Sequence, residues 1–337
     1  MLRNKILKIL IVIALIIIGV GAGYFWGFKN EQSALNKKLN VIRPLREDNA
    51  GYNFIDPLLA YVIPSADQES GMLSLKNKIT DFINNRKKNN TLSDASVFFY
   101  DLNKGRWIGS NETEKYNPAS MFKVVVMVGY LKAAEQKASI LDNYLKYTKD
   151  VDDFVKQDQF NALPELKVGE SYKVSDLINK MIIDSDNGSY ALLLKNLDQT
   201  GLESIFNSLN IENPSLTDDF TISPRTYSLF LRILYSATYL DSADSEKALS
   251  ILSKTTFVDG LVSGLPKGTI VAHKFGNYNV LANGVVQSIE LHDCGIVYYP
   301  KNPYLLCVMT KGSNLDGLKS TIKNISSLVY QNYSSLK

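Results

Sequence analysis

The chain has 337 residues, of which 45% are hydrophobic and 21% charged, the balance of an ordinary globular protein. Its formal net charge of +3 comes from the first eight residues, because the remainder holds 34 basic and 34 acidic side chains. No basic stripe follows, so nucleic acid is not an expected partner. The composition leaves the oligomeric state open.

An uncharged apolar run covers residues 9–28, "ILIVIALIIIGVGAGYFWGF". As a helix it would span roughly 30 Å, the thickness of a bilayer core, with an aromatic anchor at its end. We expect an uncleaved single-pass transmembrane anchor behind a cytoplasmic tail of residues 1–8. A cleaved signal peptide is the alternative, because Val20-Gly21-Ala22 weakly resembles a cleavage site.

Residues 29–70 are polar and irregular and contain three prolines, so they are predicted to form a stalk. Within them "FIDPLLAYVI" is too apolar for a free linker and is compatible with packing on the domain that follows. We place that domain at 71–337.

The domain begins with a segment of helical periodicity, residues 75–83, followed by a strand hairpin around Asn103-Lys104-Gly105. Residues 118–255 are mainly helical in pattern. Three strand-like runs follow, and the tail from 315 to 328 is helical again. This order predicts an α+β fold in which an antiparallel five-stranded sheet is flanked by the terminal helices and carries an inserted all-helical lobe. A site at the seam of two such lobes would lie in a cleft.

The two cysteines, Cys294 and Cys307, lie on neighbouring predicted strands joined by "YYPKNPY". They are placed to face each other across a hairpin. A disulfide and two buried free thiols both remain open, so cysteine usage does not indicate the redox compartment.

Ser120 and Lys123 stand at the start of a helical stretch, "YNPASMFKVVVMVGYLKAAEQ". Pro118 suits a first helical turn and Asn117 a cap. A serine in that turn lies among unpaired N–H groups, and a lysine three residues later shares its face. Burial, the helix terminus and a second cation would lower the pKa of that lysine and make it a base.

Two further motifs follow in order. "MIIDSDNGSYALLL" places Ser185-Asp186-Asn187 between two helical segments, and "IVAHKFGNY" places Lys274-Phe275-Gly276 on a strand. Taken singly, each is explained as well by a turn or a surface lysine. Together with Ser120 and Lys123 they resemble the S-x-x-K, S-D-N and K-T-G motifs of class A β-lactamases and penicillin-binding proteins, over roughly residues 70–335.

The resemblance implies a role for each matching residue. Ser120 would be the nucleophile, Lys123 its base and Lys274 the second cation. Ser185 would relay a proton to the leaving nitrogen, and Asn187 would hold Lys123 and the substrate. The segment Phe275, Gly276 and Asn277 would bind substrate, with the oxyanion held by the N–H groups of Ser120 and Asn277. No metal or other cofactor is implied, since His273 and His292 do not form a metal pair by spacing, and His273 is expected to support the strand.

One departure from the family concerns deacylation. The family's E-x-x-L-N loop, whose glutamate activates water, is absent before "TDDFTISPRTY", where Asp219 and Pro224 match the segment that follows the loop. The nearby acids Glu212, Asp218 and Asp219 are explained equally well as loop and capping residues. We therefore expect slow deacylation, which suits a penicillin-binding protein better than an efficient β-lactamase.

A second departure concerns the substrate. Phe275 replaces the threonine or serine whose hydroxyl helps to bind the substrate carboxylate, and Cys294 stands where some class A enzymes carry an arginine. Either Lys274 and Ser185 suffice to hold a carboxylate, or the true substrate lacks one.

We therefore expect a bacterial, membrane-anchored serine hydrolase on the extracytoplasmic side of the cell membrane. Its substrate would be a β-lactam or a D-alanyl peptide of the cell wall. The alternative is a catalytically degenerate module that binds a cell-wall peptide or a protein without turnover.

Overall fold

The structure, a computed structural model, describes the following residues: 45–46, 51–60, 70–89, 92–157, 166–212, 220–282, 284–300 and 302–333. The anchor predicted at 9–28 lies outside them, as do most of the predicted stalk and the segment 213–219. Within the described ranges, no helix is both apolar enough and long enough to cross a membrane.

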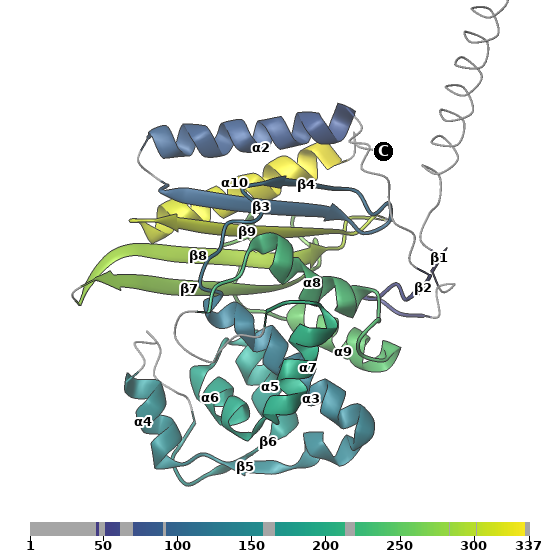
Figure 1. The fold of residues 1–337 in the computed structure, drawn as a ribbon, viewed down its shortest axis with the longest axis vertical. Coiled ribbons are helices and arrows are strands. Elements are labelled where there is room, and N and C mark those ends of the chain that lie inside the picture. The colour runs from purple at the N-terminus through teal and green to yellow at the C-terminus, as the bar shows by residue number, and fades with distance from the viewer. Residues whose placement is uncertain are drawn as a thin grey trace, which may run out of the picture.

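The centre of the described chain is a five-stranded antiparallel sheet (Figure 1), as the sequence predicted. Its order is β4-β3-β9-β8-β7, so the hairpin β3–β4 forms one edge and the last three strands fill the sheet from the other edge, β7, inward to β9 in the middle. The strands are β3 (Asp94–Asp101), β4 (Trp107–Ser110), β7 (Val271–Ala282), β8 (Val285–Val297) and β9 (Tyr304–Gly312).

The two terminal helices, α2 (Ser70–Lys88) and α10 (Leu315–Tyr333), cover one face of the sheet (Figure 1). Their apolar stripes meet alternate strand residues such as Phe99 and Leu306 in a core that holds Leu75, Ile322 and Val329. This face accounts for the helical periodicity at both ends of the domain.

The other face packs against the inserted lobe, whose central helix is α3 (Lys123–Gln136). Its run of valines is buried on all sides, which explains why it shows little amphipathic pattern. Around it stand the short helices η1 (Ala119–Phe122) and η2 (Ala138–Asp142) and the helices α4 (Lys149–Gln157), α5 (Val174–Ile183), α6 (Asn187–Asn196), α7 (Gln199–Ser208), α8 (Pro224–Tyr235) and α9 (Ser242–Leu252).

The prediction of an all-helical lobe was wrong in one detail. Strands β5 (Tyr144–Lys146) and β6 (Ser171–Lys173) pair as a two-stranded antiparallel ribbon at the edge of the lobe. Each has only three residues, too few to show an alternating pattern in the sequence, and their pairing partners are 25 to 29 residues apart.

The segment 51–60, inside the predicted stalk, is folded onto the domain. The N–H groups of Asn53, Phe54 and Ile55 donate to the Glu246 carboxylate on α9 at 2.8–3.1 Å, and Ile55 is buried. Strand β2 (Leu58–Ala60), at the end of this segment, forms a short antiparallel pair with β1 (Leu45–Arg46). The described part of the apolar stretch, residues 54–60, is therefore part of the folded unit and packs against α9 and the end of α8.

The structure decides the question of the cysteines. Cys294 on β8 and Cys307 on β9 are directly opposite each other in the register and form a disulfide. A directly opposed pair of this kind joins two central strands covalently.

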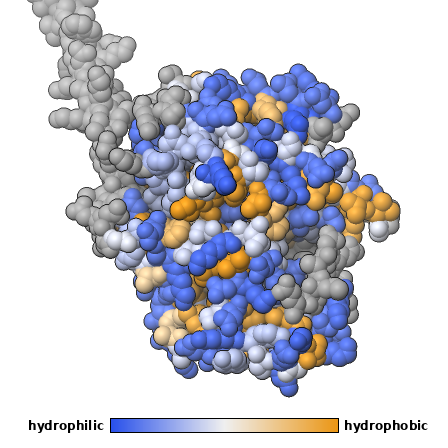
Figure 2. Space-filling model, turned by 180° about the vertical axis from the view of Figure 1, so that it is seen from behind, coloured by the Kyte–Doolittle hydropathy of each residue, from blue (hydrophilic) through white to orange (hydrophobic). Residues whose placement is uncertain are grey.

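The β7–β8 hairpin extends beyond the rest of the sheet. Its tip forms the apolar protrusion at the right-hand edge in Figure 2, and its exposed apolar side chains are Tyr278, Leu281, Val285 and Val286. Strand β7 is the outer strand, so among the described residues one of its edges has no β-sheet partner.

Candidate active site

Ser120 was predicted to lie in the first turn of an α-helix, but the structure places it on a tighter turn. It belongs to the 3₁₀ helix η1, and α3 begins only at Lys123. The Asn117 side chain accepts a hydrogen bond from the Ala119 N–H at 2.8 Å, while Pro118 occupies the cap position of η1. Ala119 has φ +46°, a left-handed conformation that an alanine adopts only when its surroundings impose it.

Strand β7 imposes part of that conformation. A Cβ at Gly276 would lie 2.5 Å from the carbonyl oxygen of Pro118 and 3.3 Å from the Ala119 Cβ. Only glycine permits β7 to pass this close to the turn. The third position of the K-F-G motif is therefore explained by packing, and the packing brings Ser120 against β7.

Strand β8 holds the same turn through two side chains that the sequence analysis did not place there. Glu290 accepts from the Asn117 N–H at 3.1 Å, and His292 Nε2 donates to the Asn117 carbonyl at 3.1 Å. His292 Nδ1 accepts from the Thr310 N–H at 3.2 Å, which leaves Nε2 as the protonated nitrogen. Both backbone polar groups of Asn117, three residues before Ser120, are thus held by β8.

Burial alone would raise the pKa of Glu290, but its contacts with His292 and Lys311 outweigh burial and the pKa lies below its usual value. Glu290 therefore grips the turn as a carboxylate. For His292 the sequence predicted only that it does not form a metal pair with His273. Its spacing of two from Glu290, which sets both on one face of β8, was the available sequence clue.

Lys123 is 1% exposed and its ammonium lies among neutral acceptors. Nζ donates to the Ser185 carbonyl at 2.6 Å, to Asn187 Oδ1 at 2.7 Å and to Ser185 Oγ at 3.2 Å. Burial lowers the pKa of Lys123 from 10.5 to about 7, although the charge of Asp186 opposes the shift. Near neutral pH this amine is available as a base.

Lys274 on β7 is fully buried, and its Nζ donates to Ser185 Oγ at 2.9 Å and to the Phe275 carbonyl at 3.2 Å. Burial and then the charge of Lys123 lower its pKa well below the usual value. The Ser185 hydroxyl oxygen therefore accepts from both lysines, and its own proton is left to donate elsewhere.

Ser185 stands in the link between α5 and α6 with φ +59°, a left-handed position that turns its side chain between the lysines. The next residue, Asp186, caps α6 by accepting from the Ser189 N–H at 2.6 Å. Because Asn187 Oδ1 accepts from Lys123, its amide NH₂ retains two donors for a ligand.

The Asn277 N–H points to the free edge of β7, as alternation along the strand shows. The His273 carbonyl accepts from Thr255 Oγ1 and the Phe275 carbonyl from Lys274 Nζ, so both face away from β8. Two residues further on, Asn277 faces the same way. Ser120, in the first turn of η1, has an N–H without an intrahelical acceptor. These are the two donors predicted for an oxyanion.

The structure thus brings Ser120, Lys123, Ser185, Asn187 and Lys274 to one seam between the sheet and the lobe. Phe275 lies beside Lys274, Gly276 packs against the turn that carries Ser120, and Asn277 follows it on β7. Glu212 is exposed, and Pro224 opens α8 behind its cap Ser223. Asp218 and Asp219 lie outside the described residues. His273 is buried on the opposite face of β7.

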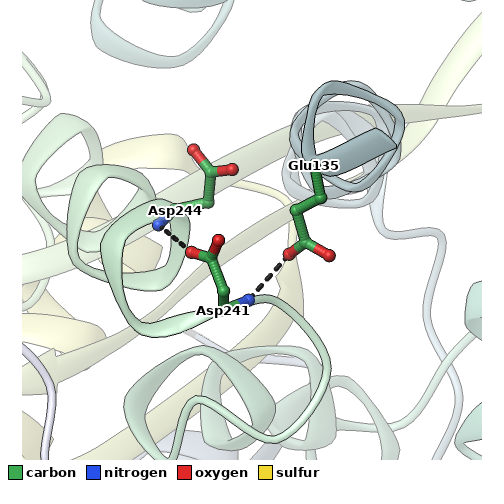
Figure 3. Close-up of side chains that lie close together, drawn as sticks. All are labelled: Glu135, Asp241 and Asp244. Carbon is green, nitrogen blue, oxygen red and sulfur yellow. Dashed lines mark hydrogen bonds between the residues drawn. The ribbon is translucent and has the colours of Figure 1, made fainter. Parts of the chain in front are cut away.

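Three acids, Glu135, Asp241 and Asp244, gather elsewhere in the lobe (Figure 3), with side-chain oxygens within 4.8 Å of one another. Glu135 accepts from the Asp241 N–H at 2.7 Å and Asp241 from the Asp244 N–H at 2.8 Å. Glu135 also accepts from Lys132 at 2.6 Å. These bonds cap α9 and tie it to α3, roughly 20 Å along α3 from Ser120. The cluster is accounted for by packing.

Comparisons with known proteins agree with this geometry. The family model described as the beta-lactamase enzyme family matches residues 74–333. A β-lactamase of Streptomyces fradiae is 26% identical over 234 residues, 64% of this chain and 72% of its own length, and one of Streptomyces albus G is 24% identical over 66% and 74%.

Solved structures share the fold. PBP-A superposes with a TM-score of 0.68 at 22% identity, covering 80% of this chain and 100% of its own. A PBP-A variant in an acyl-enzyme complex with penicillin G gives 0.66 at 21%, over 78% and 97%. A β-lactamase of Xanthomonas campestris gives 0.63 at 19%, over 77% and 98%.

Proposed function

Because the chain belongs to the beta-lactamase enzyme family, it is a serine hydrolase that works through an acyl-enzyme, and we propose that Ser120 carries the acyl group. The observation that supports this most strongly is the bridge of Ser185 Oγ between the two buried lysines beside the Ser120 turn. Such an arrangement suits proton transfer between a nucleophile and a leaving group.

These contacts support the following reaction. Neutral Lys123 takes the Ser120 proton as Oγ attacks the carbonyl carbon of an amide, lactam or ester. The N–H groups of Ser120 and Asn277 hold the oxyanion, and such a donor contributes about 3–4 kcal/mol to transition-state stabilisation. When the bond to the leaving atom breaks, Ser185 donates its proton to that atom and regains one from Lys123.

The substrate class is proposed from the family. A β-lactam or a D-alanyl peptide of the cell wall fits an acyl-serine mechanism, and a PBP-A variant of the same fold holds penicillin G as an acyl-enzyme. We further propose slow deacylation. In the described part of the site Asp186 is engaged as a helix cap, and no carboxylate contacts Lys123 or Lys274.

The proposed location is the outer face of the cell membrane, held by a transmembrane segment at 9–28. The apolar run in the sequence supports the anchor. The Cys294–Cys307 disulfide supports an oxidising compartment, because such bonds persist mainly outside the cytoplasm.

The proposal is tested by intact-mass spectrometry of the full chain with an activated aryl ester and with benzylpenicillin, beside Ser120→Ala. An adduct from at least one donor that disappears in Ser120→Ala supports it, and an adduct that lasts for hours supports slow deacylation. If neither donor labels the protein, or if Ser120→Ala is labelled equally, Ser120 is not the nucleophile. The alternative function, a catalytically degenerate binding module, which the replacement at Phe275 favours, would then explain the protein better.

A further inference from the structure

An aromatic pair stands at the edge of β7 beside the buried lysines. The rings of Phe257 and Phe275 stack with centroids 4.1 Å apart and an interplanar angle of 20°. Both side chains are half-buried, so each keeps an accessible surface. Lys274 Nζ lies 4.2 Å from the centroid of the Phe275 ring, which thus occupies space next to the ammonium.

The surroundings of Lys274 Nζ leave little room for a ligand. Nζ donates to Ser185 Oγ and to the Phe275 carbonyl, and the Phe275 ring lies beside it. Lys123 Nζ is occupied in the same way by two oxygens of Ser185 and by Asn187. A substrate carboxylate would compete with these contacts for Lys274 and would have to pass the Phe275 ring.

Among the residues whose side chains the structure describes, Lys123 and Lys274 are the only buried lysines or arginines. The arginines whose side chains the structure describes are held elsewhere, by α10, by Asp101 or over an aromatic ring: Arg86, Arg106, Arg225 and Arg232. The stretches 158–165 and 213–219, which the structure does not describe, contain no lysine or arginine.

Strand β7 beyond Gly276 is also uncharged, reading "NYNVLA", and Tyr278 and Leu281 are exposed along it. A leaving group aligned with this edge meets amide, aromatic and aliphatic groups. Placing an unpaired carboxylate against such a surface is costly, whereas an apolar or neutral group gains contact area.

We propose that the Phe257–Phe275 pair makes this site selective for acyl donors whose leaving group carries no carboxylate, such as neutral esters or amides with an aromatic or aliphatic leaving group. This inference rests on the proposed acylation of Ser120 and narrows its substrate class. Donors with a free carboxylate next to the scissile bond, including unmodified penicillins, are then poor substrates.

The test uses two aryl esters of phenylacetylglycine that differ in one group. One releases 3-hydroxybenzoate and the other its neutral amide, 3-hydroxybenzamide, in the Ser120-dependent reaction of the full chain. We expect kcat/KM for the neutral ester to exceed that for the carboxylate ester by about tenfold or more, the size of one lost charge-assisted hydrogen bond. This ratio needs no variant and is not affected by misfolding of a mutant.

Substitutions at Phe275 then assign the preference to the ring. Phe275→Thr supplies a hydroxyl donor and frees Lys274, so kcat/KM for the carboxylate ester should rise about tenfold relative to the neutral ester. Phe275→Leu, which remains apolar, should keep the wild-type ratio. Tyr144→Thr makes the same kind of change on the exposed β5 ribbon and serves as the control.

The two proposals fail differently. Equal rates for the two esters, or a preference for the carboxylate ester, with Ser120-dependent turnover intact, would overturn the selectivity and leave the acylation of Ser120 standing. An absence of Ser120-dependent turnover or adduct with both esters would overturn the acylation itself, and the selectivity with it.

Discussion

His273 and Lys274 are adjacent on β7 and bury titratable side chains on opposite faces of the sheet. The two side chains have opposite kinds of partner. His273 Nδ1 lies 2.8 Å from Asp293 Oδ1, and Asp293 Oδ2 accepts from the Leu261 N–H at 2.8 Å. Glycines make room for this pair, because a Cβ at Gly260 would lie 2.2 Å from Asp293 Oδ2. Lys274, the next residue, is buried against another lysine, and its polar contacts are neutral.

The difference separates two uses of burial. On the face covered by α10, a buried carboxylate is completely paired, so it contributes to a single well-defined packing of β7, β8 and the loop that holds Leu261. On the face covered by the lobe, two amines are left without a counter-ion in contact. That arrangement costs stability but holds a base in its reactive, neutral form.

The largest effect should come from removing one of the unpaired amines. Lys123→Met retains the length of the side chain without the base, and we expect the acylation rate to fall about 10²–10⁴-fold while the free energy of unfolding rises. Rapid-mixing acylation and urea unfolding measure the two quantities. Lys195→Met on α6, at an exposed ion pair with Asp150, is the control and should change both only slightly. A stable variant that still acylates at the wild-type rate would show that Lys123 is not the base.

Removing the paired carboxylate on the other face should change stability in the opposite direction. Asp293→Ala leaves His273 and the Leu261 N–H without a buried partner, and we expect the free energy of unfolding to fall by about 3–5 kcal/mol. Asp259→Ala removes a surface partner of Lys319 and should cost less than about 1 kcal/mol. A loss at Asp293 no greater than at Asp259 would contradict the contrast between the two faces.

A smaller effect is expected where β8 holds the nucleophile turn. Glu290→Ala frees the Asn117 N–H, and we expect kcat for acylation to fall about tenfold because Ser120 is less well positioned. Glu290→Gln keeps an acceptor and should restore most of the rate. A loss shared equally by Ala and Gln would show that the negative charge, and not the hydrogen bond to the turn, is what matters.

The stability of the protein should also depend on pH. Because the pKa of Lys123 is about 7 in the folded protein and 10.5 otherwise, the unfolded chain binds more protons between these values. Stability attributable to this residue therefore rises with pH across that window. The gain in unfolding free energy from Lys123→Met should be greatest below pH 7 and should fade toward pH 10.5. A gain independent of pH would mean that Lys123 is not buried as a titrating amine.

Local patterns in the sequence were enough to predict much of the fold and the list of candidate site residues. Helical spacing and alternation gave the terminal helices and the five strands, and the motifs gave Ser120, Lys123, Ser185 and Lys274. What the sequence did not reveal depends on distant pairs. The hydrogen bond between Glu290 and Asn117 joins residues 173 positions apart, and the one between Glu246 and Asn53 joins residues 193 positions apart.

The same reason applies to the details that were wrong. The helical start was predicted at Pro118 from local capping rules, yet close packing against Gly276 tightens that turn into a 3₁₀ helix. The stack of Phe257 on Phe275 joins a loop to a strand and has no local pattern. Motifs therefore predicted which side chains the structure brings together, while the register of β7 and β8 determines how they are held.

The most direct test of the central claim is the pH dependence of Ser120 acylation by a neutral aryl ester, with the rate of Ser120→Ala subtracted. If Lys123 must be neutral, the rate rises with pH through a midpoint near 7 and levels off above it, and Lys123→Met loses both the rate and the midpoint. A rate that is flat from pH 5 to 9, or a midpoint unchanged in Lys123→Met, would contradict the role of the buried amine.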